Sequence, residues 1–417
     1  MDPYLQEIAR LQKLYDEVET DEEVDLAGDS GSEADDCANL EYNSDSAESG
    51  DEETVVEPST TSTRISSTDR LLYKSKDGTL WQKHVPRTSG RARTHNIISH
   101  LPGTKGEATR SKSYLECWSV FFNDEMLNSI VECTNIFISQ VAQNYKDPSD
   151  ARPIDLAELK AVIGLLYIMG MFKSGRQNSK DFWNTDGTGL EICLATMAHR
   201  RFVFLLRCLR FDNKHTRNER KLIDKFCPIR NLFDKFLENC KKSYTAGAYV
   251  TLDEMLFAFR GRCSFKVYIP SKPARYGLKV FALVDARTFY VLNLEVYLGK
   301  QPDGPFQTNN SASEIVKRMC IPIYNSGRNV TMDNWFTSYG VVKEMLERHR
   351  ITIVGTIRKN KREIPAELTQ AKGRPVRSSV FAFQQNVTIV SYCPKKSKIV
   401  LCISSFHNSD SIDVNIL

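Results

Sequence analysis

The chain has 417 residues, of which 41% are hydrophobic and 26% charged, a composition typical of a soluble protein with two or three domains. The formal net charge of +4 hides an asymmetry, because the first 60 residues hold 20 Asp/Glu and 2 Lys/Arg, a balance of −18 that leaves +22 for the remainder. The basic body suits a polyanion, either nucleic acid or an anionic membrane surface, although a generic basic surface has the same composition. The longest apolar run, residues 161–172, is shorter than the roughly 20 residues of a membrane span, so we expect none.

The first half of the chain divides into three predicted regions. Residues 1–63 are acidic and poor in aromatics, which predicts a disordered tail, because such a segment buries too little apolar surface to offset ordering. Residues 64–113 are polar and basic, and we expect a loosely ordered N-terminal arm. Apolar residues at three- and four-residue spacing then predict a helical domain over 114–245, with Asn123 and Asp150 as helix starts and helices at 123–144, 153–173, 198–211 and 227–242.

After residue 245 the apolar period changes to two, which is typical of strands. We predict strands at 249–259, 280–285, 289–298, 329–332 and 351–357, with helices at 312–320 and 338–349 between them. This order predicts a mixed α/β sheet covered by helices over residues 246–365. Three further strands, at 380–385, 387–392 and 399–404, predict a β-rich region over 366–417.

Two carboxylates lie at predicted strands. Asp253 is inside the first strand of this region, and Asp333 directly follows the fourth. If the two strands are neighbours, both side chains can reach one spot and hold divalent cations through oxygen ligands. Two metals about 4 Å apart can activate a water and stabilise the leaving oxygen of a phosphodiester. The alternative is that Asp333 caps the following helix and Asp253 is an ordinary surface position.

Basic residues interleaved with aromatic ones follow Asp253, and a second basic run lies at residues 358–362. Cations neutralise phosphates, while aromatic rings stack on exposed bases. Each run alone is typical of a solvated face, but both runs beside the two carboxylates indicate DNA phosphate chemistry. The predicted DNA-contacting residues are Arg260, Arg262, Lys266, Lys272, Arg275, Lys279, Arg358, Lys359, Lys361 and Arg362.

These segments resemble the hallmark blocks of the piggyBac family of transposases, from about residue 80 to the end of the chain. The resemblance implies an RNase H-like core in which three Asp bind Mg²⁺, with Asp253 and Asp333 as the first two. It also implies cleavage and joining of DNA at TTAA sites. The blocks that carry it are Leu252-Asp253-Glu254, Phe259-Arg260-Gly261-Arg262, Tyr268-Ile269-Pro270-Ser271-Lys272-Pro273, Met332-Asp333-Asn334-Trp335-Phe336-Thr337-Ser338 and Thr352-Ile353-Val354-Gly355-Thr356-Ile357-Arg358.

The chain departs from the family pattern at its C-terminus. The third Asp of the family lies in a Gly-Gly-Val-Asp block, and neither that block nor the family's cysteine-rich zinc module occurs in the 417 residues. We therefore expect an incomplete catalytic core and a truncated β-rich insertion over 366–417. Three functions stay open: a transposase-derived DNA-binding protein that does not cut, an active transposase whose C-terminal part is outside this sequence, and a protein-interaction scaffold.

The resemblance also implies partners and a compartment. The family acts as a dimer through its helical domain, so a homodimer is expected, and the acidic tail is a candidate protein-binding segment. Eleven scattered cysteines without a C-x-x-C pair, and an N-terminus without an apolar signal segment, predict the cytosol or nucleus. We expect the nucleus, with Arg91, Arg93 and residues 395–398 as weak import signals.

Overall fold

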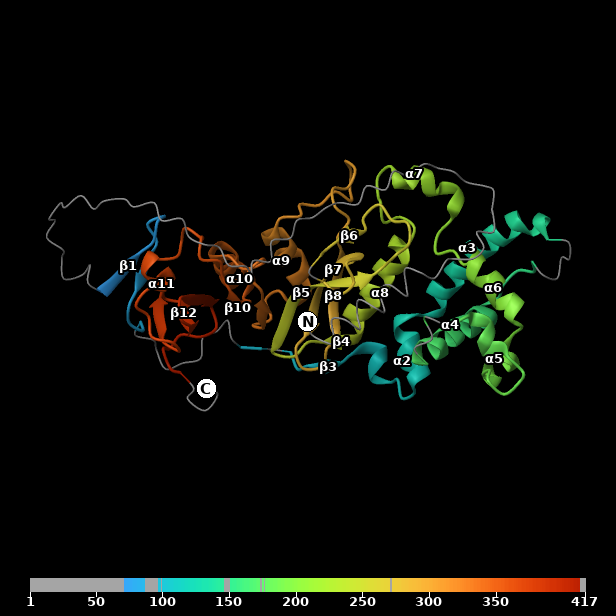
Figure 1. Ribbon diagram of the computed structural model, residues 1–417, viewed down its shortest axis with the longest axis horizontal. Helices are drawn as coiled ribbons and strands as arrows, with labels where there is room; N and C mark the ends of the chain where they lie inside the picture. Colours follow the sequence, from blue (N-terminus) through green and yellow to red (C-terminus); the bar gives the residue numbers. More distant parts are fainter. Residues whose placement is uncertain are drawn as a thin grey trace, which may run out of the picture. The chain divides into compact units, whose positions relative to one another are not determined.

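The computed structural model describes residues 71–86, 97–98, 100–145, 151–172, 175, 177–270 and 272–412, all of which belong to the unit Cys37–Leu417 (Figure 1). The predicted acidic tail, residues 1–63, lies outside this part of the chain. Among the described residues, no helix is both long and apolar enough to cross a membrane.

The regular elements described between residues 114 and 243 are helices, within the region where a helical domain was expected over 114–245. Asn123 begins α3 as expected, and its side chain accepts a hydrogen bond from the N–H of Met126 over 3.0 Å. The start predicted at Asp150 lies outside the described residues, and α4 begins at Leu156, where Asp155 caps it by accepting the N–H of Glu158 over 2.7 Å. The α-helices described here are α2 (Tyr114–Phe121), α3 (Asp124–Val141), α4 (Leu156–Met171), α5 (Glu191–Thr196), α6 (His199–Cys208), α7 (Arg217–Lys221) and α8 (Arg230–Ser243).

A large mixed sheet follows, which confirms the predicted α/β class. Among the described residues it has 11 strands, in the order β1-β2-β11-β12-β13-β10-β9-β5-β7-β6, with β8 paired to β7. The strands are β1 (Leu72–Lys74), β2 (Leu80–Gln82), β5 (Tyr249–Ala258), β6 (Val267–Tyr268), β7 (Tyr276–Asp285), β8 (Val291–Val296), β9 (Asn329–Met332), β10 (Thr352–Thr356), β11 (Ser379–Phe383), β12 (Thr388–Lys395) and β13 (Lys398–Ser404), and the short pair β3 (Gly103–Thr104) and β4 (Tyr244–Thr245) lies apart.

Helices cover one face of this sheet. Ile315, Val316 and Met319 of α9 (Ala312–Cys320) join the same buried cluster as the inward-facing strand residues Leu252 and Ile353. The helix α10 (Tyr339–His349) adds further apolar side chains to this cluster, and the short α11 (Ala366–Thr369) adds one. The core therefore fixes which face of β5, β9 and β10 is buried and leaves the other face for polar side chains.

The N-terminal arm differs from the loosely ordered segment that we expected. Residues 72–82 form the antiparallel pair β1–β2, and β2 joins the sheet next to β11. Trp81 is fully buried, and its indole N–H donates to the carbonyl of Glu363 over 3.0 Å. A single buried Trp in a basic segment supplies enough apolar area to order it, because aromatic side chains dominate core energetics.

Candidate metal and nucleic-acid site

The strand register brings Asp253 and Asp333 together. β5 and β9 are parallel neighbours in which Leu252 is opposite Met332, so the next residues along the two strands are Asp253 and Asp333. Leu252 and Met332 are buried on the helix-covered face, and side chains alternate along a strand. Both carboxylates therefore point to the opposite face, where both are exposed.

Local hydrogen bonds hold Asp333 in a turn. Its Oδ1 accepts the N–H groups of Trp335 (2.9 Å) and Phe336 (3.3 Å), while the Thr337 hydroxyl donates to its carbonyl over 2.6 Å. The following helix α10 has its own cap, since Ser338 accepts the N–H of Val341. Asp333 is thus fixed by the turn that precedes the helix, and the alternative of a capping role at α10 does not describe it.

The same turn needs a glycine on the neighbouring strand. Gly355 of β10 lies opposite Met332 in the parallel β9–β10 pair. A Cβ at Gly355 would come within 2.5 Å of the Thr337 hydroxyl oxygen and 2.6 Å of the Met332 carbonyl oxygen. The backbone that carries Asp333 therefore approaches β10 more closely than any other residue type at position 355 allows.

Two exposed carboxylates side by side fit part of a magnesium site, since Mg²⁺ is held through one or two carboxylates together with substrate phosphates. Asp253 Oδ1 accepts the N–H of Glu254 over 2.8 Å, and in the described part of the chain neither Asp forms an ion pair. No group of three or more His, Cys, Asp or Glu within the described residues is placed to hold a metal. The donor set here is therefore the Asp253–Asp333 pair.

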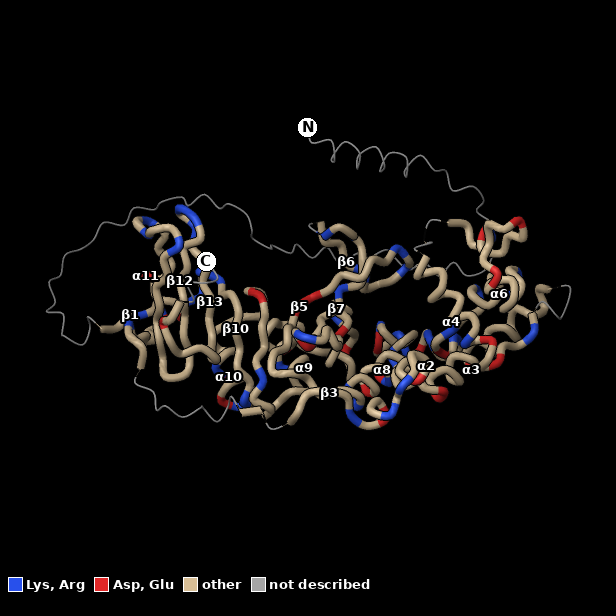
Figure 2. Tube along the Cα trace, turned by 90° about the horizontal axis from the view of Figure 1, so that it is seen from below, with Lys and Arg blue, Asp and Glu red and all other residues tan. Residues whose placement is uncertain are grey.

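The two basic segments both follow strands whose carboxyl ends lie on this side of the sheet. Because β5, β9 and β10 run parallel, their carboxyl ends lie on the same side, and each is followed by part of the site. The chain after β5 carries the first basic segment, and the chain after β10 carries the second, where Arg358 Nε donates to Asn334 Oδ1 over 3.4 Å beside Asp333. Figure 2 shows Lys and Arg positions along the chain around β6 and β7.

Most of the predicted DNA-contacting residues are accessible. Arg260, Arg262, Arg275, Arg358, Lys359 and Arg362 are exposed, and Lys266, Lys272 and Lys361 are half-buried. Aromatic residues accompany them, with Phe257, Phe259 and Tyr276 36–52% exposed. This surface has the cations and exposed rings that a nucleic-acid strand requires.

Lys279 does not share this surface. It is 3% exposed on β7, and its Nζ lies above the rings of Phe281 and Trp335, 5.1 Å from each centroid. Such burial does not fit the exposed phosphate contact that we expected for it. The register gives the reason, because Lys279 lies two residues from Phe281 and so shares its buried face.

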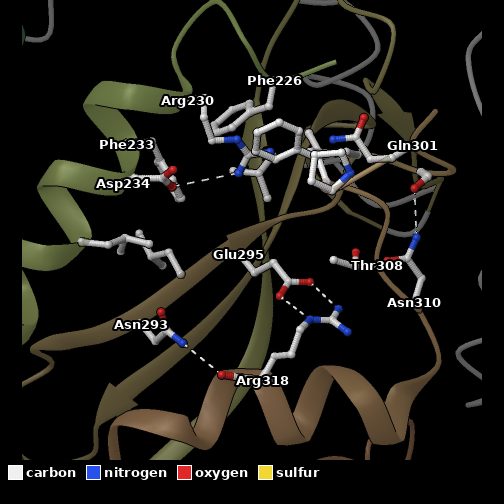
Figure 3. Close-up of a pocket in the computed structure, with 17 residues that line it drawn as sticks. Phe226, Arg230, Phe233, Asp234, Asn293, Glu295, Gln301, Thr308, Asn310 and Arg318 are labelled. Carbon is white, nitrogen blue, oxygen red and sulfur yellow. Dashed lines mark hydrogen bonds and ion pairs between the residues drawn. The ribbon is translucent and has the colours of Figure 1, made fainter. Parts of the chain in front are cut away.

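A cavity of about 260 Å³ lies between α8, β8 and the chain that follows β8 (Figure 3). Its charged side chains are engaged with one another: Arg318 binds Glu295 at 2.7 and 2.9 Å, and Arg230 lies near Asp234 and between the rings of Phe226 and Phe306. Arg318 thereby ties α9 to β8, and Arg230 at the start of α8 contacts Phe306 in the chain that follows β8, so we read the cavity as a structural joint.

A second cavity, of about 410 Å³, lies on α6 and was not predicted from the sequence. It is lined by His199, Arg200, Arg201 and Arg207 with the rings of Tyr145 and Phe204. Arg201 is already bound to Glu158, with two contacts of 2.7 and 2.8 Å. The run His199-Arg200-Arg201 could have indicated a basic cavity in the sequence, but this segment was interpreted only by its helical periodicity.

Known transposases and transposase-derived proteins are similar to this chain over much of its length. Residues 114–416 match the family described as Transposase IS4. Over 251 residues, 59% of the chain, the sequence is 25% identical to the human piggyBac transposable element-derived protein 3 and to the human chimeric ERCC6-PGBD3 protein. A piggyBac transposase in a synaptic complex with hairpin DNA, solved by cryo-EM, matches with a TM-score of 0.71 and 37% identity over 76% of this chain.

The matches cover only part of each relative. They span 40% of the piggyBac-derived protein, 22% of the chimeric protein and 66% of the chain in the synaptic complex. The match to the IS4 transposase family nevertheless extends over most of the 417 residues and includes both Asp253 and Asp333. The chain therefore belongs to the IS4 transposase family, as a piggyBac-type member.

Proposed function

We propose that this protein is a transposase-derived DNA-binding protein whose RNase H-like core descends from an enzyme that cut and joined DNA at TTAA sites. We further propose that the chain by itself binds DNA without cutting it. The observation that carries the proposal is the convergence at one sheet edge of the Asp253–Asp333 pair and two exposed basic segments. The solved relative in a complex with hairpin DNA supports the choice of DNA as the partner.

The described residues account for binding and orientation. The exposed arginines on both sides of the carboxylates can hold successive phosphates, which aligns a strand across the edge. Phe257, Phe259 and Tyr276 offer faces on which unpaired bases stack. Asp253 and Asp333 are the residues that would hold Mg²⁺. When bound, that ion would polarise a phosphodiester and lower the pKa of a water.

The first test compares two sets of substitutions of equal charge. Alanine at Arg260, Arg262, Arg358 and Arg362 removes four predicted phosphate contacts, whereas alanine at Lys343, Arg348, Lys372 and Lys398 removes four exposed cations from other surfaces. We expect the first set to make the negative slope of log K against log salt shallower by about 3 to 4 units, at about 0.9 per contact, and the second set to change it little. Equal effects of the two sets would contradict a DNA surface at this edge.

The second test separates binding from cutting. Asp253→Asn and Asp333→Asn are expected to leave DNA binding within about twofold of the unsubstituted chain, since neither residue contributes a cation to the phosphates. Incubation with labelled TTAA-containing DNA and Mg²⁺ is expected to give no nicked product. Cleavage that both substitutions abolish would establish the alternative, an active transposase. Capture of proteins by the chain after nuclease treatment, together with a lack of salt-sensitive DNA binding, would establish a scaffold.

The proposal includes a homodimer in the nucleus. The mass in solution, measured by light scattering with and without DNA, tests the first part. Imaging of the tagged chain tests the second, and substitution of Arg91, Arg93 and residues 395–398 tests the predicted import signals.

A further inference from the structure

A buried lysine, Lys279, contacts the turn that carries Asp333, and the proposed function gives it no role. Lys279 is 3% exposed in the middle of β7. Burial lowers its pKa by penalising the charged form, while the carboxylates of Glu254, Asp333 and Asp253 act in the opposite direction. A cation is retained in such a position only where other groups replace its water.

Three aromatic rings surround the ammonium. The Nζ of Lys279 lies 5.1 Å from the ring centroids of Phe281 and Trp335 and 5.8 Å from that of Tyr297. These distances are within the range in which the face of a ring attracts a cation, and the attraction is strongest for Trp and for desolvated pairs. The lysine therefore draws Trp335 towards β7.

Trp335 belongs to the turn that holds Asp333. Its backbone N–H donates to Asp333 Oδ1 over 2.9 Å. Its ring lies parallel to that of Phe281, with centroids 5.9 Å apart and planes inclined by 10°, and meets Phe336 edge-on at 4.7 Å. The ring that contacts Lys279 and the N–H that orients the Asp333 carboxylate therefore belong to the same residue.

We propose that Lys279 is a positioning residue, which holds Trp335 against Phe281 and thereby fixes the Asp333 carboxylate beside Asp253. This inference rests on the proposed function, because the carboxylate that it positions is one of the two proposed metal ligands. It assigns to Lys279 a role inside the protein in place of a phosphate contact on its surface.

The proposal makes a prediction opposite in sign to simple electrostatics. Removal of a cation near two carboxylates should tighten metal binding if the charge alone matters, because like charges repel. Removal of a positioning residue should weaken it, because Asp333 then samples orientations that cannot share a metal with Asp253. Lys279→Met tests the two cases, since it keeps most of the side-chain volume and removes the charge.

The first measurement does not depend on a metal. The chain is labelled with 5-fluorotryptophan, and the signal of Trp335 among the four tryptophans is assigned with Trp335→Phe. In Lys279→Met we expect the Trp335 signal to shift and broaden, whereas Lys279→Arg restores it, and the exposed control Lys343→Met leaves it unchanged. An unchanged Trp335 signal in Lys279→Met overturns the proposal, and Lys279→Gln serves in its place if that variant does not fold.

The second measurement is binding of Tb³⁺, detected by luminescence that nearby tryptophan sensitises. We expect the affinity to fall about tenfold in Lys279→Met, the scale of one desolvated cation–π contact. Affinity that is unchanged or tighter in Lys279→Met overturns the proposal. If Asp253→Asn and Asp333→Asn leave Tb³⁺ binding unaffected, the proposed metal site fails, and the fluorine signal of Trp335 still decides the role of Lys279.

Discussion

The joint between α8 and the sheet and the carboxyl edge of β5 and β9 use carboxylates in opposite ways. At the joint, Asp224 is 2% exposed and accepts Arg230 at 2.9 and 3.0 Å, Gln301 at 2.8 Å and the N–H of Phe226 at 3.0 Å. At the edge, Asp253 and Asp333 are exposed and accept only N–H groups of the residues that follow them, among the described residues.

The difference separates stability from function. A buried carboxylate whose lone pairs are all engaged holds two parts of the fold together. Removal of that carboxylate destabilises the protein, because it leaves the charge of its partner buried without compensation. Two neighbouring exposed carboxylates without an ion pair contribute little to stability and keep their oxygens for a ligand.

Asp224→Ala should lower the free energy of unfolding by about 3 to 5 kcal/mol, because it leaves the Arg230 guanidinium partly buried without its carboxylate. Asp253→Asn, at the exposed edge, should change it by no more than about 0.5 kcal/mol. Denaturant unfolding followed by tryptophan fluorescence measures both. Similar losses in the two variants would show that the edge is as much a part of the stable core as the joint.

Gly355→Ala should lower the free energy of unfolding by about 1 to 3 kcal/mol, because its Cβ overpacks the turn that carries Asp333. Gly340 in α10 is the matched control, since a Cβ there meets no atom within 4 Å. Gly340→Ala should raise stability by up to about 1 kcal/mol through helix propensity. A stable Gly355→Ala chain would mean that the close approach of β9 and β10 is not needed to place Asp333.

Acid should remove the contribution of Asp224 to stability. Although burial raises the pKa of Asp224, hydrogen bonds from Arg230, the Phe226 N–H and Gln301 prevail and hold it below its usual value of 3.8. A depressed folded-state pKa gives stability that is present above the unfolded value and lost as pH falls through the folded one.

The stability difference between the unsubstituted chain and Asp224→Ala should therefore be constant from about pH 7 to pH 5 and shrink below about pH 4. Urea unfolding at each pH measures it. A difference that grows on acidification would contradict the sign of the pKa shift.

Much of the fold followed from local patterns. Alternation of apolar residues predicted β9 at its observed bounds, and the helix predicted at 312–320 is α9 (Ala312–Cys320). The pattern failed at β1 and β2, where three-residue strands are too short for a period to show and where Trp81 carries the ordering. It also misplaced the start of α4, because an Asp at 150 and another at 155 offer the same capping chemistry.

The candidate site was predictable in its residue types but not in its surroundings. Asp253 and Asp333 could be chosen because both occur at strands, and the basic segments because they are contiguous in the chain. The basic run does not distinguish Lys279 from the surface cations, although its spacing of two residues from Phe281 and four from Leu283 places it on the buried face. The residue type gives the charge of a side chain. The face of the sheet on which the side chain lies decides whether that charge contacts solvent or aromatic rings.

The sequence by itself determined most of the longer helices and strands, the carboxylates at strand ends and the basic segments, because helix and strand periods are properties of adjacent residues. The tertiary structure decided which of these residues meet. The pairing of Leu252 with Met332, 80 residues apart, puts Asp253 beside Asp333, and the parallel direction of β5, β9 and β10 gathers both basic segments at one edge. Such a register depends on how helices and strands fill a common core, and no local period encodes it.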